Sequence, residues 1–149
     1  MKRTRQTHLT AMQRSKVSLP IRKHLMDEMT DPCKRRLDYG CGRGYDADSL
    51  GMFKYDPHFF NNKPEGKFHT VWCGYVLNVL NKQEGQEVVD EIKALLHDRG
   101  MAYVAVRRDM KDDNPNQRKV VLGGDVVEYC DNSKYALYYF WKDSEVKVK

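Results

Sequence analysis

The sequence lacks any hydrophobic run that could cross a membrane. A transmembrane helix needs about 18 consecutive apolar residues, and no stretch of the 149-residue chain approaches that length. The first residues, Met-Lys-Arg-Thr-Arg, are not followed by an apolar stretch, so we also expect no secretory signal. These two absences predict a cytoplasmic protein with no membrane partner.

Cysteine is scarce and irregularly spaced. The chain has four cysteines and no C-x-x-C pair: Cys33, Cys41, Cys73 and Cys130. This pattern argues against a zinc site and is typical of reduced intracellular thiols. The sequence also lacks a His-Glu zinc pattern, a Ser-His-Asp arrangement and the lysine of a phosphate-binding loop. It therefore gives no sign of these three kinds of enzyme, and we expect no metal.

What is present is an ordinary globular composition with an uneven charge. Hydrophobic residues make up 40% of the chain and charged residues 32%, which is typical of one soluble domain. Residues 1–36 hold ten Lys/Arg and three Asp/Glu, whereas residues 37–149 hold sixteen and eighteen. We expect a basic N-terminal helical arm (1–34) joined to a single domain (35–143), with nucleic acid as a candidate partner of the arm. The alternative is a solvated basic surface.

The most informative stretch is residues 36–44, Arg-Leu-Asp-Tyr-Gly-Cys-Gly-Arg-Gly. Gly40, Gly42 and Gly44 stand at alternate positions, and glycine lets the backbone take a positive φ and approach a ligand closely. Such glycines at a strand-to-helix turn form a crevice for a nucleoside-bearing cofactor, although the spacing is not the G-x-G-x-x-G of dinucleotide-binding proteins. Asp38, at the strand end, suits a cofactor with a nearby amine. The alternative is a simple tight turn.

A second carboxylate follows a short way along the chain. Phe53 to Asp56 is interpreted as a strand that ends in this carboxylate, with Pro57 stopping the ladder. A carboxylate at the carboxyl end of the neighbouring parallel strand can accept hydrogen bonds from both hydroxyls of a ribose. Asp-Pro is also a common start of a turn, so the ribose interpretation depends on the pairing with residues 36–44.

These motifs resemble a known family. Leu37–Gly44 resembles the first motif of class I S-adenosylmethionine (SAM)-dependent methyltransferases, and Asp56 resembles their ribose-binding acid. Val71–Leu80 is similar to their fourth strand and the loop after it. With Thr10–Arg14 and Leu19-Pro20, the similarity is greatest to the methyltransferases found with DNA phosphorothioation genes and to related phage and bacterial proteins.

The resemblance extends over roughly residues 8–110. It implies a compact, trimmed Rossmann-like α/β fold with a mostly parallel sheet, and SAM as the cofactor. It implies cofactor-binding roles for Asp38, Tyr39, Gly40, Cys41, Gly42, Gly44, Tyr45, Asp56, Pro57, Cys73 and Gly74. Tyr75 and Asn78 are the candidate catalytic residues, because both can hydrogen-bond to a methyl acceptor; the alternative is that they only cap the next helix.

The chain departs from the family beside the cofactor. Only nine residues separate Gly44 from Lys54, so the first helix is short, and residues 59–67 leave no room for the usual second helix and third strand. The usual adenine contact is therefore in doubt, and we consider four substitutes: Tyr45, Asp46, His58 and Phe59.

Motifs of base-methylating enzymes are absent. Gly74–Leu77 is not the Asp/Asn-Pro-Pro-Tyr of enzymes that methylate exocyclic amines, and no Pro-Cys of cytosine-C5 enzymes follows that strand. Arg107, Arg108 and Asp109 could grip an anionic substrate, although a charged strand end is usually just solvated. The acceptor is unassigned, with a substrate on or near nucleic acid as one option. The alternatives are a degenerate methyltransferase-fold binding module without catalysis, and an enzyme that consumes the cofactor in another reaction.

Periodicity and turn residues predict the order of the elements. Helices are expected over 9–30, broken at Leu19-Pro20, and over 83–98, with Gly100 as the stop. Strands are expected over 35–39, 52–56, 68–75 and 101–107, followed by a C-terminal antiparallel hairpin with strands over 120–129 and 134–141. We expect the polar loop over 111–118 to act as a lid and the tail after Lys142 to be frayed.

Overall fold

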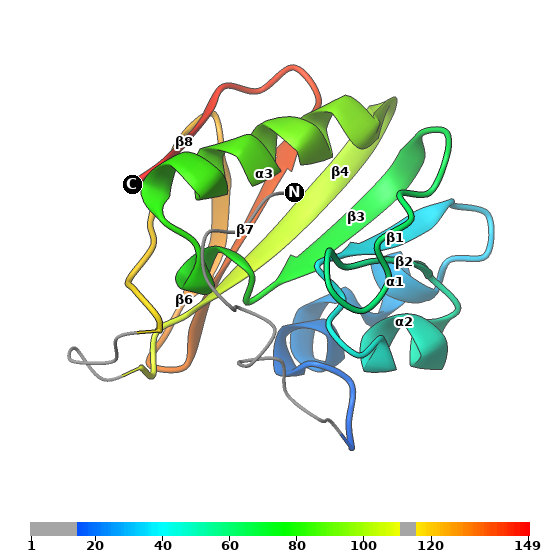
Figure 1. Ribbon diagram of the computed structural model, residues 1–149, viewed down its shortest axis with the longest axis horizontal. Helices are drawn as coiled ribbons and strands as arrows, with labels where there is room; N and C mark the ends of the chain where they lie inside the picture. Colours follow the sequence, from blue (N-terminus) through cyan, green and yellow to red (C-terminus); the bar gives the residue numbers. More distant parts are fainter. Residues whose placement is uncertain (1–14, 111–115) are drawn as a thin grey trace.

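A computed structural model describes residues 15–110 and 116–149 of the chain (Figure 1). The first part of the helix expected over 9–30, and residues 111–115 of the expected lid, lie outside these described residues. The second half of that helix is confirmed. A π-helical segment, η2 (Ile21–Leu25), runs directly into α1 (Met26–Thr30).

The fold is built on a six-stranded sheet with the strand order β2-β1-β3-β4-β7-β6. Its parallel part consists of β2 (Phe53–Tyr55), β1 (Arg36–Tyr39), β3 (Phe68–Gly74) and β4 (Leu96–Arg107). An antiparallel hairpin, β6 (Val127–Asp131) and β7 (Tyr135–Trp141), extends the sheet beyond β4. The expected α/β fold, mostly parallel with a C-terminal antiparallel hairpin, is confirmed. The carboxyl ends of the four parallel strands meet at one edge, which is where such sheets hold ligands.

Helices cover both faces of the sheet (Figure 1). On one face, α3 (Lys82–Leu95) forms a core with the strands, and its buried apolar residues are Val88, Val89 and Ile92. On the other face, η2, α1 and α2 (Tyr45–Leu50) form a second core, which includes Ile21, Leu25, Met29, Ala47 and Trp72. Successive side chains of a strand point to opposite faces, so the same strands supply both cores. No helix within the described residues is long and apolar enough to span a bilayer.

The start of α3 follows from its sequence, but its end differs from our expectation. Asn81 and Glu84 form a capping box: Glu84 N donates to Asn81 Oδ1 (2.8 Å) and Asn81 N donates to Glu84 Oε1 (3.0 Å). The helix ends at Leu95 rather than Asp98, because buried Leu96 pairs with Phe68 and begins β4 at once. The predicted stop role of Gly100 is therefore wrong.

Gly100 lies inside β4, beside a register shift between β3 and β4. A Cβ at this position would lie 2.7 Å from the carbonyl oxygen of Phe68. Glycine is thus required by a close approach of two backbones rather than by the end of a helix.

The chain end is held in the structure rather than frayed, so that expectation is also wrong. β8 (Val146–Val148) pairs antiparallel with β5 (Leu122–Gly124) in a separate two-stranded sheet, which splits the strand expected over 120–129 into β5 and β6. The side-chain amide of Gln86 in α3 forms two hydrogen bonds to the backbone of β8. Its Nε2 donates to Val146 O (2.8 Å), and its Oε1 accepts from Val148 N (2.9 Å).

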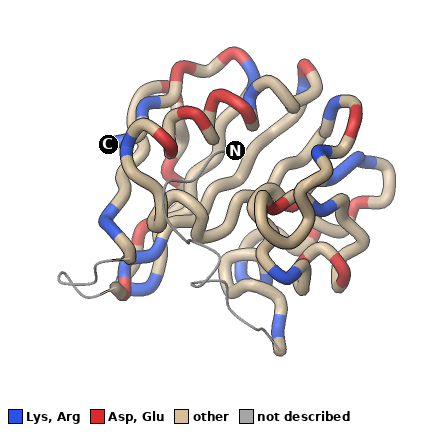
Figure 2. Tube along the Cα trace, in the orientation of Figure 1, with Lys and Arg blue, Asp and Glu red and all other residues tan. Residues whose placement is uncertain are grey.

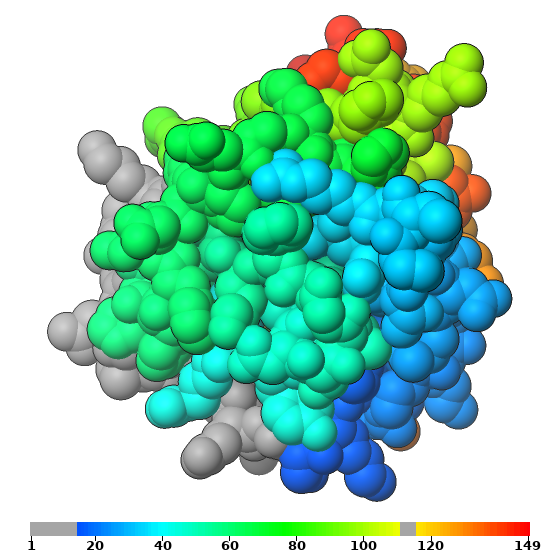
Figure 3. All heavy atoms as spheres, turned by 90° about the vertical axis from the view of Figure 1, so that its right-hand side faces the viewer, coloured from blue at the N-terminus to red at the C-terminus, as the bar shows by residue number. Residues whose placement is uncertain are grey.

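β2 is the last strand on its side of the sheet. Residues 56–67 contain no helix and no further strand, only a single bridge between Asp56 and Phe60, so the expected loss of those elements is confirmed. Lys54 Nζ lies 4.4 Å from the centre of the Phe60 ring. Figure 3 shows this side of the molecule, which is formed largely by the first half of the chain.

Two cations directly after the expected basic arm belong to the fold. The Arg35 guanidinium stacks over the rings of Phe53 and Phe68, 4.5 Å and 4.2 Å from their centres. The guanidinium of Arg36 donates to carbonyl oxygens of α1 and α2. Figure 2 shows that Asp and Glu gather along α3, whereas most Lys and Arg lie away from it.

Candidate functional site

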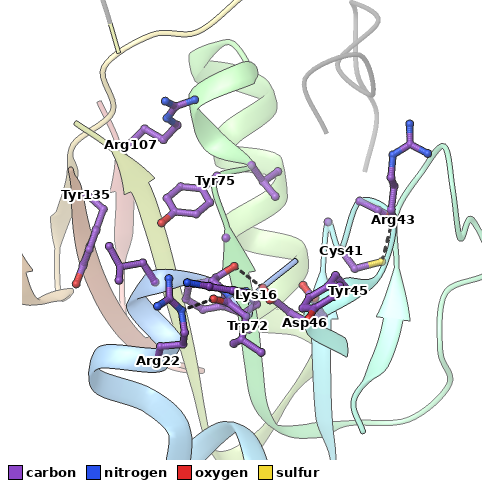
Figure 4. Close-up of a pocket in the computed structure, with 18 of the residues that line it drawn as sticks. Lys16, Arg22, Cys41, Arg43, Tyr45, Asp46, Trp72, Tyr75, Arg107 and Tyr135 are labelled. Carbon is purple, nitrogen blue, oxygen red and sulfur yellow. Dashed lines mark hydrogen bonds between the residues drawn. The ribbon is translucent and has the colours of Figure 1, made fainter. Parts of the chain in front are cut away.

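A cavity of about 440 Å³ lies at the carboxyl edge of the parallel strands (Figure 4). Its size is within the usual range of small-molecule sites, roughly 300–1,000 Å³. Eight of the sequence-predicted site residues line it. Five come from the glycine-rich stretch: Asp38, Gly40, Cys41, Gly42 and Tyr45. The other three follow β2 or end β3: Asp56, Gly74 and Tyr75.

The glycine turn is closed by hydrogen bonds to the neighbouring strand. The N–H groups of Gly40 and Cys41 both donate to the carbonyl oxygen of Tyr55, at 2.7 Å and 3.0 Å. Gly40 has a φ of 77°, and a Cβ there would lie 2.4 Å from Val76 Cγ2. Only glycine therefore allows the turn to pass under Val76 and bring its main chain to the cavity.

Asp56 holds this turn against the loop that follows β2. Its Oδ2 accepts from Gly42 N (2.9 Å), and its Oδ1 accepts from His58 N (2.9 Å) and Phe59 N (3.2 Å). An ionised carboxylate offers about four acceptor positions, so it can accept a further hydrogen bond from a ligand. Asp38 and Asp56 are each 3% exposed, and both line the same cavity.

The Cys41 thiol lies near these two acids. Burial, together with the negative charges of Asp38 and Asp56, raises the pKa of Cys41 well above its ordinary value. The sulfur therefore stays protonated at neutral pH and is a weak nucleophile, which makes Cys41 part of the wall rather than a reactive group.

Other predicted cofactor residues do not line the cavity. Tyr39 and Cys73 are fully buried in the α3-side core, because alternate strand residues point away from the cavity face. Gly44 precedes α2 and packs against Lys54, and Pro57 also lies outside the lining. The sequence motif identified the turn correctly, but not which face each side chain takes.

Asn78 is likewise not brought to the cavity. It is buried, its Oδ1 accepts from Arg107 N (2.7 Å), and its Nδ2 donates to Arg118 O (3.1 Å). Nor does it cap α3, since Asn81 does. Asn78 instead fixes the end of β4, where Arg107 lies.

Tyr75 lines the cavity from a strained backbone. Its φ is 63°, and it is the single non-glycine residue with positive φ in the described chain. Its N–H donates to Ala105 O (2.9 Å), which anchors the turn after β3. A Cβ on the preceding Gly74 would lie 2.6 Å from the Trp72 ring, so this glycine leaves room for an indole in the cavity wall.

One wall comes from a segment that was not expected to reach the cavity. Residues 15–19 line the cavity and are fastened to α2. Ser18 donates twice to the buried carboxylate of Asp46, from its N–H to Oδ1 (2.9 Å) and from its hydroxyl to Oδ2. Tyr45 Oη donates to Ser15 O (2.9 Å). Of the four suggested adenine contacts, Tyr45 and Asp46 therefore hold this segment, whereas His58 and Phe59 do not line the cavity.

The charged residues at the end of β4 have different surroundings: one is hydrogen-bonded within the fold, and two line the cavity. Arg108 is used internally, since it donates to Asp131 Oδ1 (3.2 Å) and to Val120 O (2.8 Å). Arg107 and Asp109 line the cavity. Four cations from other segments also line the cavity: Lys16, Arg22, Arg43 and Lys134. Among the residues described, no group of three or more His, Cys, Asp or Glu side chains could hold a metal ion.

The fold resembles those of several solved structures. TehB from Haemophilus influenzae superimposes with a TM-score of 0.55 at 12% identity, over 85% of this chain and 62% of that one. An O-methyltransferase family protein from Burkholderia thailandensis gives 0.51 at 12% identity, over 80% and 55%. LepI in complex with SAM gives 0.51 at 11% identity, over 91% and 52%. This chain therefore matches only about half to three-fifths of each of those chains.

No protein-family model matches the sequence, and no curated protein matches it. At 11–12% identity the structural likeness establishes the fold alone. That fold is the Rossmann-like one found in methyltransferases, such as the O-methyltransferase family protein above.

Proposed function

We propose that this chain is a SAM-dependent methyltransferase. The observation that carries the proposal is the pair of buried carboxylates, Asp38 and Asp56, facing one cavity beside the main chain of Gly40–Gly42. Similar folds are found in an O-methyltransferase family protein and in a protein crystallised with SAM.

In this proposal the chain binds and aligns, and SAM supplies an already activated methyl group. Asp56 accepts from a ribose hydroxyl, and Asp38 faces the ammonium group of the cofactor. Tyr75 hydrogen-bonds to the acceptor. A bond forms between the acceptor atom and the methyl carbon as the sulfur–carbon bond breaks, and the acceptor's proton leaves to solvent or a base. Alignment and exclusion of water are then the main contributions of the protein.

A methyl acceptor on or near nucleic acid belongs to the same proposal. A relationship to the phosphorothioation-associated proteins and a cytoplasmic location belong to it as well. The support for nucleic acid is the surplus of basic residues before residue 37. Lys16 and Arg22 of this segment border the cavity, whereas Arg35 and Arg36 are held by the fold.

Calorimetric titration with SAM and S-adenosylhomocysteine (SAH) tests the proposal. We expect binding, and we expect Asp56→Ala to weaken it at least about tenfold, or ~1.4 kcal/mol. Asp48→Ala is the matched control, because this carboxylate of α2 is exposed, pairs with Lys54 and does not line the cavity. Circular dichroism checks that the variants are folded. No heat at millimolar ligand would reject the function, and an unchanged affinity in Asp56→Ala would refute the ribose contact.

The second candidate is a binding module on a degenerate methyltransferase fold. The shortened sheet edge at β2 favours it. It predicts retention on heparin or DNA with a steep salt dependence and no heat with either cofactor form, so the same titration separates the two candidates. An enzyme that consumes SAM in another reaction would instead bind it and release product without an acceptor.

A further inference from the structure

The two ends of the cavity carry opposite charge. The end formed by β1, α2 and the loop after β2 holds the buried carboxylates of Asp38, Asp46 and Asp56. It also holds one cation, Arg43, whose guanidinium lies 5.2 Å from the centre of the Phe59 ring. The other end holds four cations and one acid: Lys16, Arg22, Arg107, Lys134 and Asp109. Figure 4 shows Arg107 beside Tyr75 on one side of this basic end, Arg22 and Lys16 on the opposite side, and Tyr135 between them.

The two arginines keep donors available. Arg107 Nε donates to Asp109 Oδ1 (2.9 Å), but both side chains are a third or more exposed, and such pairs contribute only about 0–1 kcal/mol. Arg22 Nε donates to Val17 O (2.7 Å). Among the described residues, the Nη groups of these two guanidiniums have no acceptor. Each can therefore form the two parallel hydrogen bonds with which arginine binds phosphate oxygens.

Both arginines are also positioned by the fold. The backbone N–H of Arg107 is fixed by the buried Asn78, at 2.7 Å, at the end of a central strand. Arg22 lies on η2 next to Ile21, which is fully buried in the second core. A site on such elements is held more precisely than one on a free loop.

Resting on the proposed function, we infer that the methyl acceptor carries a phosphate group, which the basic end of the cavity binds through Arg107 and Arg22. The surplus of cations over Asp109 suits a dianion better than a single carboxylate. The phosphate holds the accepting atom next to Tyr75, facing the cofactor at the acidic end. A small phosphomonoester and the backbone of a nucleic acid share this chemistry.

Calorimetry on SAH-saturated protein tests the inference, with inorganic phosphate as the probe. We expect phosphate to bind, and Arg107→Gln and Arg22→Gln each to weaken it by about tenfold while leaving SAH affinity unchanged. Arg99→Gln is the control, because Arg99 is exposed and lies outside the cavity. Thymidine monophosphate and a short single-stranded DNA then distinguish the two sources. Much tighter, salt-sensitive binding of the DNA indicates a nucleic acid, and equal binding indicates a small molecule.

Two results would overturn the inference and leave the proposed function standing. One is SAH binding without phosphate binding. The other is a loss of SAH affinity in Arg107→Gln or Arg22→Gln, which would show that these cations serve the carboxylate of the cofactor. If the unaltered chain binds no SAH, the proposed function and this inference both fail.

Discussion

At the scale of single residues, the backbone at Tyr75 has the clearest energetic consequence. A left-handed conformation costs a non-glycine residue roughly 1–2 kcal/mol, and the turn after β3 imposes it with a φ of 63°. Such strain persists only where the surroundings fix it, and it gathers at functional sites. The N–H of Tyr75, bonded to Ala105 O at 2.9 Å, supplies that constraint here.

We predict that Tyr75→Gly is more stable than Tyr75→Ala by about 0.5–1 kcal/mol. Both variants lose the ring, but only glycine relieves the backbone, and its extra entropy in the unfolded chain offsets part of the gain. Urea unfolding measures the difference in the free energy of unfolding. An alanine variant as stable as the glycine variant would contradict the left-handed backbone. Neither variant should support methyl transfer, because both lack the hydroxyl.

The places of residues at the cavity could be predicted from sequence where the residues lie close together in the chain. Asp38 and Gly40 are two positions apart in one strand-to-turn motif, and both line the cavity. The place of Asn78 outside the cavity could not be predicted, because its partners, Arg107 and Arg118, are 29 and 40 residues away in sequence. Arg22 was missed for the same reason, since only the folded sheet brings it to the cavity.

At the scale of elements, residues 15–19 act as a wall that is fastened to α2 at two places. The stronger fastening is the buried pair of hydrogen bonds from Ser18 to Asp46. A buried acceptor that loses its donor costs about 1–3 kcal/mol. The Ser18 hydroxyl is therefore expected to contribute measurably to holding this wall on α2.

We predict that Ser18→Ala loosens this wall and speeds tryptic cleavage after Lys16 and Arg22. The free energy of unfolding should fall by about 1–3 kcal/mol, because Asp46 Oδ2 loses its buried donor. Ser49→Ala is the matched control, since Ser49 lies on the exposed side of α2. Equal cleavage rates in the two variants would show that the hydrogen bonds do not hold the segment.

Periodicity predicted whether a segment is a helix or a strand more reliably than it predicted where the segment ends. The capping pair Asn81 and Glu84 lies close to the predicted start of α3, at Gln83. The predicted end of α3, at residue 98, lies three residues beyond the observed end. Leu96 continues the apolar pattern of the helix, but it pairs with Phe68 as part of a strand. Sequence spacing cannot distinguish these two uses of one leucine.

At the scale of the whole molecule, the last residues close the structure. Val146 and Val148 are 4% and 2% exposed, and β8 lies against α3. Burial of a valine side chain contributes about 1.5–3 kcal/mol. The chain end thus stabilises the same helix that covers the central strands.

We predict that Val148→Ser lowers the free energy of unfolding by about 2 kcal/mol. Lys147→Ser, on the exposed side of β8, should change it by less than about 0.5 kcal/mol. Thermal and urea unfolding of both variants measure this. Equal effects would contradict the alternation of buried and exposed residues in β8.

The overall architecture was predictable because its central part repeats strand, helix and parallel strand. The pairing of β5 with β8 was not, because each has only three residues and their partnership spans the hairpin between them. A strand of three residues is too short to show a clear alternation of apolar and polar residues, so the sequence does not indicate its partner.

The chain has two tryptophans in contrasting places. Trp72 is 1% exposed in the cavity wall, and Trp141 is 38% exposed at the end of β7. The emission of an indole depends on what lies against it, so replacing Trp141 with Phe leaves Trp72 as the one tryptophan, and its emission reports on the cavity wall. The molecule thus contains its own optical probe of occupancy, and no attached dye is needed to follow a ligand entering.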